Sequence, residues 1–149
     1  MPFDDLERIL RSRDDVVIGC GISELALRTA EEELELTFPL QLCDYLMQFG
    51  HLELGHFELF GLGYSVPEYL DLVRMTLSER MDSGCPLRKD LIPLLNDGGG
   101  NLYCITAGRK QTGAIILWDH AAGPDQEPDA HAPTFQEWMI QLLEELDQE

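Results

Sequence analysis

Three short apolar runs in the second half of the chain constrain its fold more than any other feature. LIPLL (91–95), LYCIT (102–106) and AIILW (114–118) are bounded by turn residues and rich in residues that favour strands. The segments between them, NDGGGN and AGRKQTG, carry the glycine and polar residues of hairpin connections. The pattern therefore predicts consecutive strands paired in an antiparallel sheet.

Helical patterns before and after these runs supply the elements that would cover such a sheet. Apolar residues recur at helical spacing from Phe3 to Leu10, and Ser23 is placed to cap a helix formed by ELALRTAEEELEL. That helix should end before Phe38-Pro39, where Pro39 suits the first turn of another helix that Gly50 terminates. The segment VVIGCG (16–21) reads as a short extended link.

The middle and the end of the chain each predict a helix that begins with a capping box. FELFGLG (57–63) is expected to be a strand, and Ser65 with Glu68 should then open a helix. The apolar stripe expected on that helix is Val66, Leu70, Val73, Leu77 and Met81. After a loop from His120 to Pro133, Thr134 and Glu137 form the second capping box. The apolar residues of the last helix share one side: Phe135, Trp138, Met139, Leu142, Leu143 and Leu146. Of these, Phe135, Trp138 and Leu142 are expected to be buried.

This order of elements predicts an α+β fold, with helices packed against an antiparallel sheet. The 149 residues fit one domain, and a hydrophobic content of 44% can build a core. We expect a single domain over 1–149, with an N-terminal helix and link at 1–21 and the core at 22–149.

The three consecutive glycines, Gly98, Gly99 and Gly100, could bind phosphate or turn the chain. Phosphate-binding glycine loops present amides at the start of a helix, whereas a strand follows these glycines. The sequence therefore favours a structural turn, in which glycine permits positive φ and a close backbone approach.

The charge of the chain excludes some ligands and suggests others. Ten Lys and Arg against 28 Asp and Glu give a net charge of −18, which would repel a phosphate backbone, so we expect no nucleic-acid ligand. The last basic residue is Lys110, and nine acidic residues follow it. This acidic C-terminal third could serve solubility or could steer a basic partner, and both interpretations stay open at this point.

The cysteines and the hydropathy pattern point to a cytoplasmic protein. Cys20, Cys43, Cys85 and Cys104 lie far apart and lack the spacing of a zinc site, so reduced thiols are expected. The N-terminal segment is acidic where a secretory peptide would be basic, and no run approaches membrane-spanning length. We therefore expect no membrane association.

Candidate catalytic and metal-binding groups do not combine into an active site. His51, Glu53 and His56 could hold a metal, but HLELGH is not the HExxH pattern and lies in a glycine-bearing loop. Asp119 and His120 could form a general base, yet neighbouring residues on a strand point to opposite faces. Asp97 could hold a cation or cap its own turn. Trp118 and Trp138 are expected in the core. We predict no catalytic residue, no metal and no cofactor.

Several motifs in their order along the chain resemble the SUKH superfamily, which includes bacterial immunity proteins and a fungal cell-wall assembly regulator. An acidic helix runs through a Pro step into an aromatic helix in EEELELTFPLQLCDYLMQFG, and the glycine-bearing strand FELFGLG follows. NDGGGNLYCI, GAIILWDH and TFQEWMIQLLEEL then match a DGGG turn, a strand ending in Trp-Asp-His and a Phe-centred terminal helix. The chain departs from the family at Phe49-Gly50-His51, where Asn-Gly-Gly is usual.

The resemblance implies a bent, mostly antiparallel sheet of about four to six strands with helices around it, and a protein-binding role without catalysis. Many bacterial members resemble immunity proteins that neutralise toxin domains, often basic nucleases. The partner expected here is another protein, most simply a basic toxin domain. The alternatives are a cytoplasmic regulatory or scaffold protein, and an enzyme or small-molecule binder built around Asp97, Asp119 and His120.

The acidic segment suggests which residues would meet a basic partner. The predicted contact residues are Asp97, Asp119, His120, Asp125, Glu127 and Asp129. If this surface were not used, the loop from His51 to His56 would be the next candidate.

Overall fold

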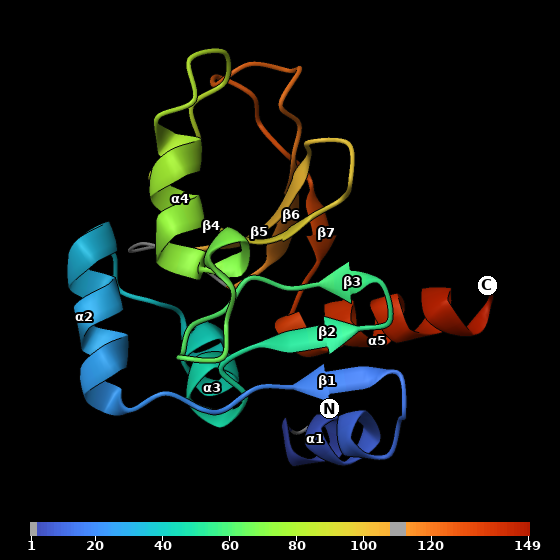
Figure 1. The fold of residues 1–149 in the computed structure, drawn as a ribbon. Coiled ribbons are helices and arrows are strands. Elements are labelled where there is room, and N and C mark those ends of the chain that lie inside the picture. Colours follow the sequence, from blue (N-terminus) through green and yellow to red (C-terminus); the bar gives the residue numbers. More distant parts are fainter. Residues whose placement is uncertain (1–2, 108–112) are drawn as a thin grey trace.

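The computed structural model describes residues 3–107 and 113–149, and Figure 1 shows how their helices and strands are arranged. Helices α2 (Glu24–Leu34) and α4 (Leu72–Arg80) lie beside each other on the left of this view, and α1 (Phe3–Arg11) lies below the first strand. Helix α5 (Phe135–Asp147), in red, runs from behind the middle of the molecule to its right-hand side, where the C-terminus lies, and the N-terminus lies at the bottom beside α1. The α+β class and the antiparallel pairing predicted from sequence are confirmed.

Four helices begin close to where the sequence predicted them: α1 (Phe3–Arg11), α2 (Glu24–Leu34), α3 (Leu40–Gln48) and α5 (Phe135–Asp147). The Ser23 hydroxyl accepts a hydrogen bond from the amide of Ala26, and the Thr134 hydroxyl accepts one from the amide of Glu137. These side chains satisfy amides that the first turn of a helix leaves without partners.

The helix expected from Ser65 is wrong in its start. A short 3-10 turn covers Glu68–Leu70, and α4 spans Leu72–Arg80, with the Asp71 carboxylate accepting a hydrogen bond from the amide of Arg74. Asp71 is extended because it pairs with Gly61, whose carbonyl accepts a hydrogen bond from the amide of Leu72 at 2.8 Å. This tertiary pairing interrupts the helix that the local pattern favoured.

The apolar stripe predicted for that helix is also partly wrong. Leu77 and Met81 are exposed, at 40% and 82% of their maximum, whereas Leu72, Val73 and Thr76 are buried. The buried face of α4 therefore differs from the apolar stripe that the sequence predicted. The polar Thr76 is accommodated there because its hydroxyl donates to the carbonyl of Leu72.

The first sheet is antiparallel and contains β1 (Val16–Ile18), β2 (Leu52–Leu54) and β3 (Phe57–Glu58) in that order. The segment read as a link is thus a strand, β2 was not expected, and the strand predicted over 57–63 is shorter. Leu54 pairs with Phe57, so Gly55 and His56 form a two-residue hairpin turn. Strand β2 has only three residues, with two leucines in alternation. An alternating pattern this short cannot be recognised in a sequence.

The second sheet contains the three predicted apolar runs and one further strand. Its order is β4 (Leu91–Asn96), β5 (Leu102–Thr106), β6 (Ile115–Trp118) and β7 (Ala130–Ala132), all antiparallel. Strand β7 lies inside the segment that was predicted to be a loop. The predicted AGRKQTG connection includes residues 108–112, which lie outside the described residues, although the amide of Thr106 bonds the carbonyl of Ala114 across the pair.

The two sheets meet where the chain leaves β3. The amide of Phe60 donates to the carbonyl of Leu94 in β4 at 2.7 Å, so the first sheet continues into the edge of the second. Pro93 is tolerated in β4 because this strand lies at an edge and bulges between Pro93 and Leu95. The predicted bent sheet therefore takes the form of two hydrogen-bonded sheets joined by this contact.

One apolar core unites the helices and both sheets. Trp118 and Trp138, predicted to be core residues, are exposed by only 1% and 0%. Phe135 at the start of α5 packs on Tyr45 of α3 with ring centroids 5.1 Å apart, and on Trp138 at 6.1 Å. This aromatic cluster attaches α5 to α3.

Candidate functional site

The three glycines lie in the turn between β4 and β5. Side chains of the same turn accept hydrogen bonds from its backbone amides. Asn96 Oδ1 accepts from the amide of Gly98 at 2.8 Å, and Asp97 Oδ1 accepts from those of Gly99 and Asn101 at 2.8 and 3.1 Å. Gly98 and Gly100 have φ values of 93° and 100°. Because the Asp97 carboxylate already caps these amides, the turn has the geometry of a strand connection and not that of a phosphate cradle.

Asn101 joins this turn to the segment that follows β6. Its Oδ1 atom lies 3.1 Å from the amide nitrogen of His120 and 2.6 Å from His120 Nδ1. A Cβ atom on Gly100 would stand 3.1 Å from the imidazole carbon Cε1, so the ring packs on the glycine backbone. The predicted residues Asp97 and His120 are thus brought together through Asn101.

The loop after β6 is ordered by Gln126. The Gln126 amide group accepts from the amide of Asp119 at 3.0 Å and donates to the carbonyls of Asp119 and Gly123 at 2.7 and 2.9 Å. Asp119 Oδ1 accepts from the amide of Ala121. These bonds hold the part of the loop from Asp119 to Gln126, which carries Asp125.

We call the six predicted contact residues the acidic edge: Asp97, Asp119, His120, Asp125, Glu127 and Asp129. Asp119 is half-buried and the other five are exposed. The structure joins the turn of Asp97 to Asp119 and His120, whereas Asp125, Glu127 and Asp129 follow on the loop toward β7. The nearby Arg88 pairs with Asp90 at 2.6 Å, and this contact, with a smaller one from Glu127, raises the pKa of Arg88.

The groups considered for catalysis are engaged with separate partners. His120 bonds Asn101 while the Asp119 carboxylate bonds Ala121, so the two do not act as a pair. His51 is buried and His56 is exposed, with its Nε2 2.6 Å from Glu149 Oε1. Within residues 3–107 and 113–149, no three His, Cys, Asp or Glu side chains are grouped so that they could hold a metal ion.

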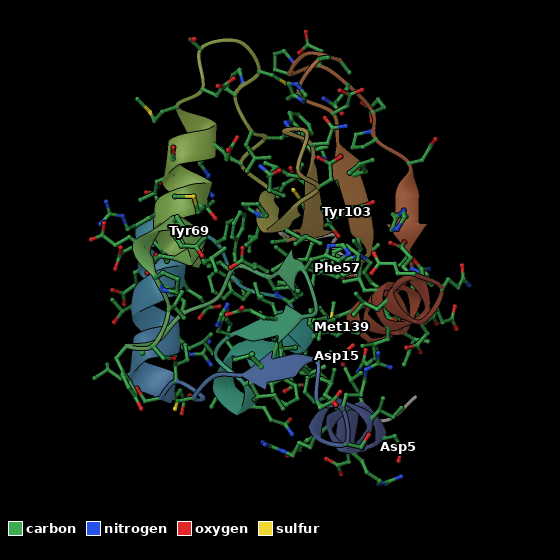
Figure 2. The ribbon with its side chains drawn as sticks, turned by 45° about the vertical axis from the view of Figure 1, so that its right-hand side comes forward. Asp5, Asp15, Phe57, Tyr69, Tyr103 and Met139 are labelled. Atoms are coloured by element: carbon green, nitrogen blue, oxygen red, sulfur yellow. The ribbon has the colours of Figure 1, made fainter. Side chains whose placement is uncertain are left out.

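Two grooves flank the Asp97 turn, and sequence reasoning missed both of them. One, of about 280 Å³, lies against Phe57, Tyr103 and Glu145, and the other, of about 370 Å³, lies against Glu58, Tyr69 and Glu79. His56, Leu95, Asn96 and Gly98 line both. In Figure 2, Phe57 and Tyr103 lie where the two sheets meet, and Tyr69 lies on the α4 side. These grooves follow from the contact between the sheets, which the sequence does not disclose.

Carboxylates in and beside these grooves shift the pKa values of neighbouring groups. A hydrogen bond from Tyr69 to Glu58 raises the pKa of the Tyr69 phenol. Burial raises the pKa of the Tyr103 phenol, and Glu145 and Asp97 add to that shift. Burial also raises the pKa of the Glu79 carboxyl, with a further contribution from Asp82. The surface between the sheets is therefore acidic and partly aromatic.

The sequence model of the family described as SUKH_5, SMI1-KNR4 cell-wall, matches residues 7–144. The chain belongs to this SUKH family. No curated protein matches it significantly. Among solved structures, a crystal structure of a protein from Pseudomonas syringae pv. tomato is similar, with a TM-score of 0.70 and 21% identity. The match covers 95% of this chain and 98% of that one and supports the same fold.

The corner at Phe49-Gly50-His51, where this SUKH chain departs from the usual family sequence at Phe49 and His51, is tightly packed. Gly50 has a φ of 70°, and a Cβ atom there would lie 2.0 Å from the carbonyl oxygen of Cys20. His51 beside it is buried. The corner is thus closely packed against the segment after β1, which leaves little of it accessible to a partner.

No helix among the described residues is both long enough and apolar enough to cross a membrane. The four cysteines are free thiols, with Cys20 exposed, Cys43 half-buried, and Cys85 and Cys104 buried. Burial raises the pKa of the Cys104 thiol. A buried thiol of this kind is a packing group and a poor nucleophile.

Proposed function

We propose that this SUKH protein is a cytoplasmic, non-enzymatic immunity protein that neutralises a toxin domain by binding it directly. The observation that supports this most is the acidic edge, where exposed carboxylates are presented on a backbone held by Asn101 and Gln126. Such a surface favours a basic protein partner, since complementary charge speeds encounter and excludes acidic competitors. It would repel nucleic acid.

The absence of catalysis is part of the same proposal. The carboxylates of Asp97 and Asp119 accept hydrogen bonds from backbone amides, so their geometry serves the turn and the loop. A general base would instead need a free acceptor directed at a substrate proton. We therefore assign these acids to partner contact and to loop structure.

The second candidate is a regulatory or scaffold protein that uses the same surface. Its support is the matching SMI1-KNR4 family, whose name refers to the cell wall. The two candidates differ in the identity of the partner and share the mode of action. The neighbouring gene separates them, because an immunity gene should lie beside the gene of its toxin.

The proposal is tested by cell protection. The variant D119N/D125N/E127Q/D129N should fold normally by circular dichroism but should fail to protect cells that express the toxin encoded next door. Its matched control, D4N/D14N/E32Q/E137Q, removes the same charge from α1, α2, α5 and the turn after α1, and should protect as the wild type does. Equal protection by both variants would exclude the acidic edge as the binding surface.

A further inference from the structure

Two glutamates face each other directly across the hairpin of β2 and β3. Glu53 pairs in register with Glu58, so both side chains project from the same face of the sheet. Directly opposed like charges destabilise an antiparallel pair. In the part of the chain that the structure describes, neither carboxylate forms an ion pair with lysine or arginine. Among the described residues, no cation therefore compensates the charge of this glutamate pair.

Two further polar groups are directed at this glutamate pair. Tyr69 Oη donates to Glu58 Oε2 at 2.9 Å. The His51 side chain is only 4% exposed, and its Nε2 lies 3.8 Å from Glu53 Oε2, beyond hydrogen-bond distance. This buried nitrogen finds no hydrogen-bond partner among the described residues, although buried polar atoms are normally satisfied. A neutral imidazole is expected here because burial lowers the pKa of His51.

The groove of about 370 Å³ gives an extended side chain access to Glu58 and Tyr69. Its apolar lining includes Phe60, Leu70 and Met75, and its charged lining residues Glu58 and Glu79 are acidic. It extends to Asn96 and Gly98 of the turn that belongs to the acidic edge. A groove lined by apolar side chains and two glutamates suits a long cationic side chain, which packs its methylene groups and pairs its charge.

We propose that these groups form a subsite, here called the cation subsite, for an arginine side chain of the protein partner: Glu53, Glu58, Tyr69 and His51. A guanidinium has five donors in a plane and can bond two carboxylates at once, whereas an ammonium is a compact point charge. Opposed residues on paired strands have Cβ atoms about 5 Å apart, a span that a planar fork can bridge. The assignment rests on the proposed function, because it supposes that the partner is a basic protein.

The test uses capped arginine, N-acetyl-arginine methylamide, in an NMR titration of the ¹⁵N-labelled protein. We expect saturable shifts at the amides of Glu53, Glu58 and Tyr69, with a Kd of about a millimolar, as is usual for so small a ligand. Capped citrulline, the neutral analogue, should give none, and capped lysine should bind several-fold more weakly.

Variants separate binding from structure. E53Q should lose about tenfold in affinity for capped arginine, the value expected for one charged hydrogen bond. It should also raise Tm, because it removes the like-charge repulsion, whereas a purely structural role for Glu53 would lower Tm. E32Q on α2 removes the same charge away from the cation subsite and should bind as the wild type does.

The proposal is overturned by any of three results: no saturable shift, equal binding of citrulline or lysine, or an E53Q variant that binds normally. This titration needs no toxin. Its failure would therefore leave the acidic edge untouched. Failure of the cell-protection test would remove the support for a basic toxin as the source of the arginine, but it would not change the binding of capped arginine.

Discussion

At the scale of single residues, the surest sequence predictions concern large apolar side chains with long periodic context. Trp138 and Phe135 were assigned to the core because they share one face of a helix with a strong cap, and both are fully buried. Leu77 and Met81 were assigned to a stripe whose start depended on Ser65, and they are exposed. The two predictions differ in the N-cap residue. Asp71, and not Ser65, caps α4, because Asp71 pairs with Gly61 in an extended conformation.

Trp138 provides the first prediction. W138A should lower the free energy of unfolding by about 3–5 kcal/mol, because it leaves a cavity in the aromatic cluster of α5. W138F should cost clearly less, since the buried indole Nε1 finds no hydrogen-bond partner within the described residues and so gives up none. Urea denaturation followed by circular dichroism measures both. A loss below about 1 kcal/mol in W138A would contradict the packing described for α5.

Gly100 provides a second prediction at this scale, with Gly99 as its control. G100A should destabilise the protein by about 1–3 kcal/mol, because the position has a φ of 100° and its new Cβ would press on the His120 ring. At Gly99 a Cβ would stand 3.5 Å from Asp97 Oδ1, an ordinary contact, so G99A should have a small effect. Equal thermal unfolding of the two variants would show that the turn is not constrained as described.

At the scale of elements, long periodic segments could be predicted and short ones could not. The three apolar runs became β4, β5 and β6, whereas β2 and β7 have three residues each and carry too little alternation to be seen. These short strands exist because a neighbour offers free hydrogen-bonding groups, as β6 does for β7. The acidic edge could be proposed from the charge of the sequence alone. The cation subsite depends on the pairing of Glu53 with Glu58, which could not be predicted because β2 was not recognised as a strand.

An ion-pair cluster that joins the two ends of the chain can be tested through pH. Arg13 bonds Asp15 at 2.9 Å and Asp147 of α5 at 2.8 Å, and these bonds lower the pKa of both carboxyls. Groups whose pKa is lowered by folding stabilise the protein above their ordinary pKa and lose that contribution as the pH falls. R13Q should therefore lower Tm at neutral pH and reduce the fall in Tm between about pH 5 and pH 3.

The control for this cluster is R8Q, because Arg8 pairs with Asp5 within α1 alone. It should leave the pH dependence of Tm nearly unchanged, since exposed pairs within one helix contribute little. Identical pH profiles for R13Q, R8Q and the wild type would mean that Arg13 does not attach α5 to the N-terminal elements.

At the scale of the whole molecule, charge and shape together support the functional account. The net charge of −18 costs stability through self-repulsion, and the acidic residues after Lys110 have no basic residue in their own segment. The fold places some of these acids on the acidic edge and leaves an acidic groove between its two sheets. A basic partner that covered these surfaces would relieve the repulsion, which gives the charge distribution a physical use.

Stopped-flow fluorescence can test whether the acidic edge binds the proposed toxin partner. The quantity to measure is the rate of association with the toxin domain encoded by the neighbouring gene, at several salt concentrations. For the wild type the rate should be fast and should fall steeply as ionic strength rises. D119N/D125N/E127Q/D129N should associate about tenfold or more slowly at low salt, with a shallower salt dependence, while the control variant keeps the wild-type slope. An association rate and a salt dependence equal to those of the wild type in the acidic-edge variant would mean that the acidic edge does not bind the toxin domain.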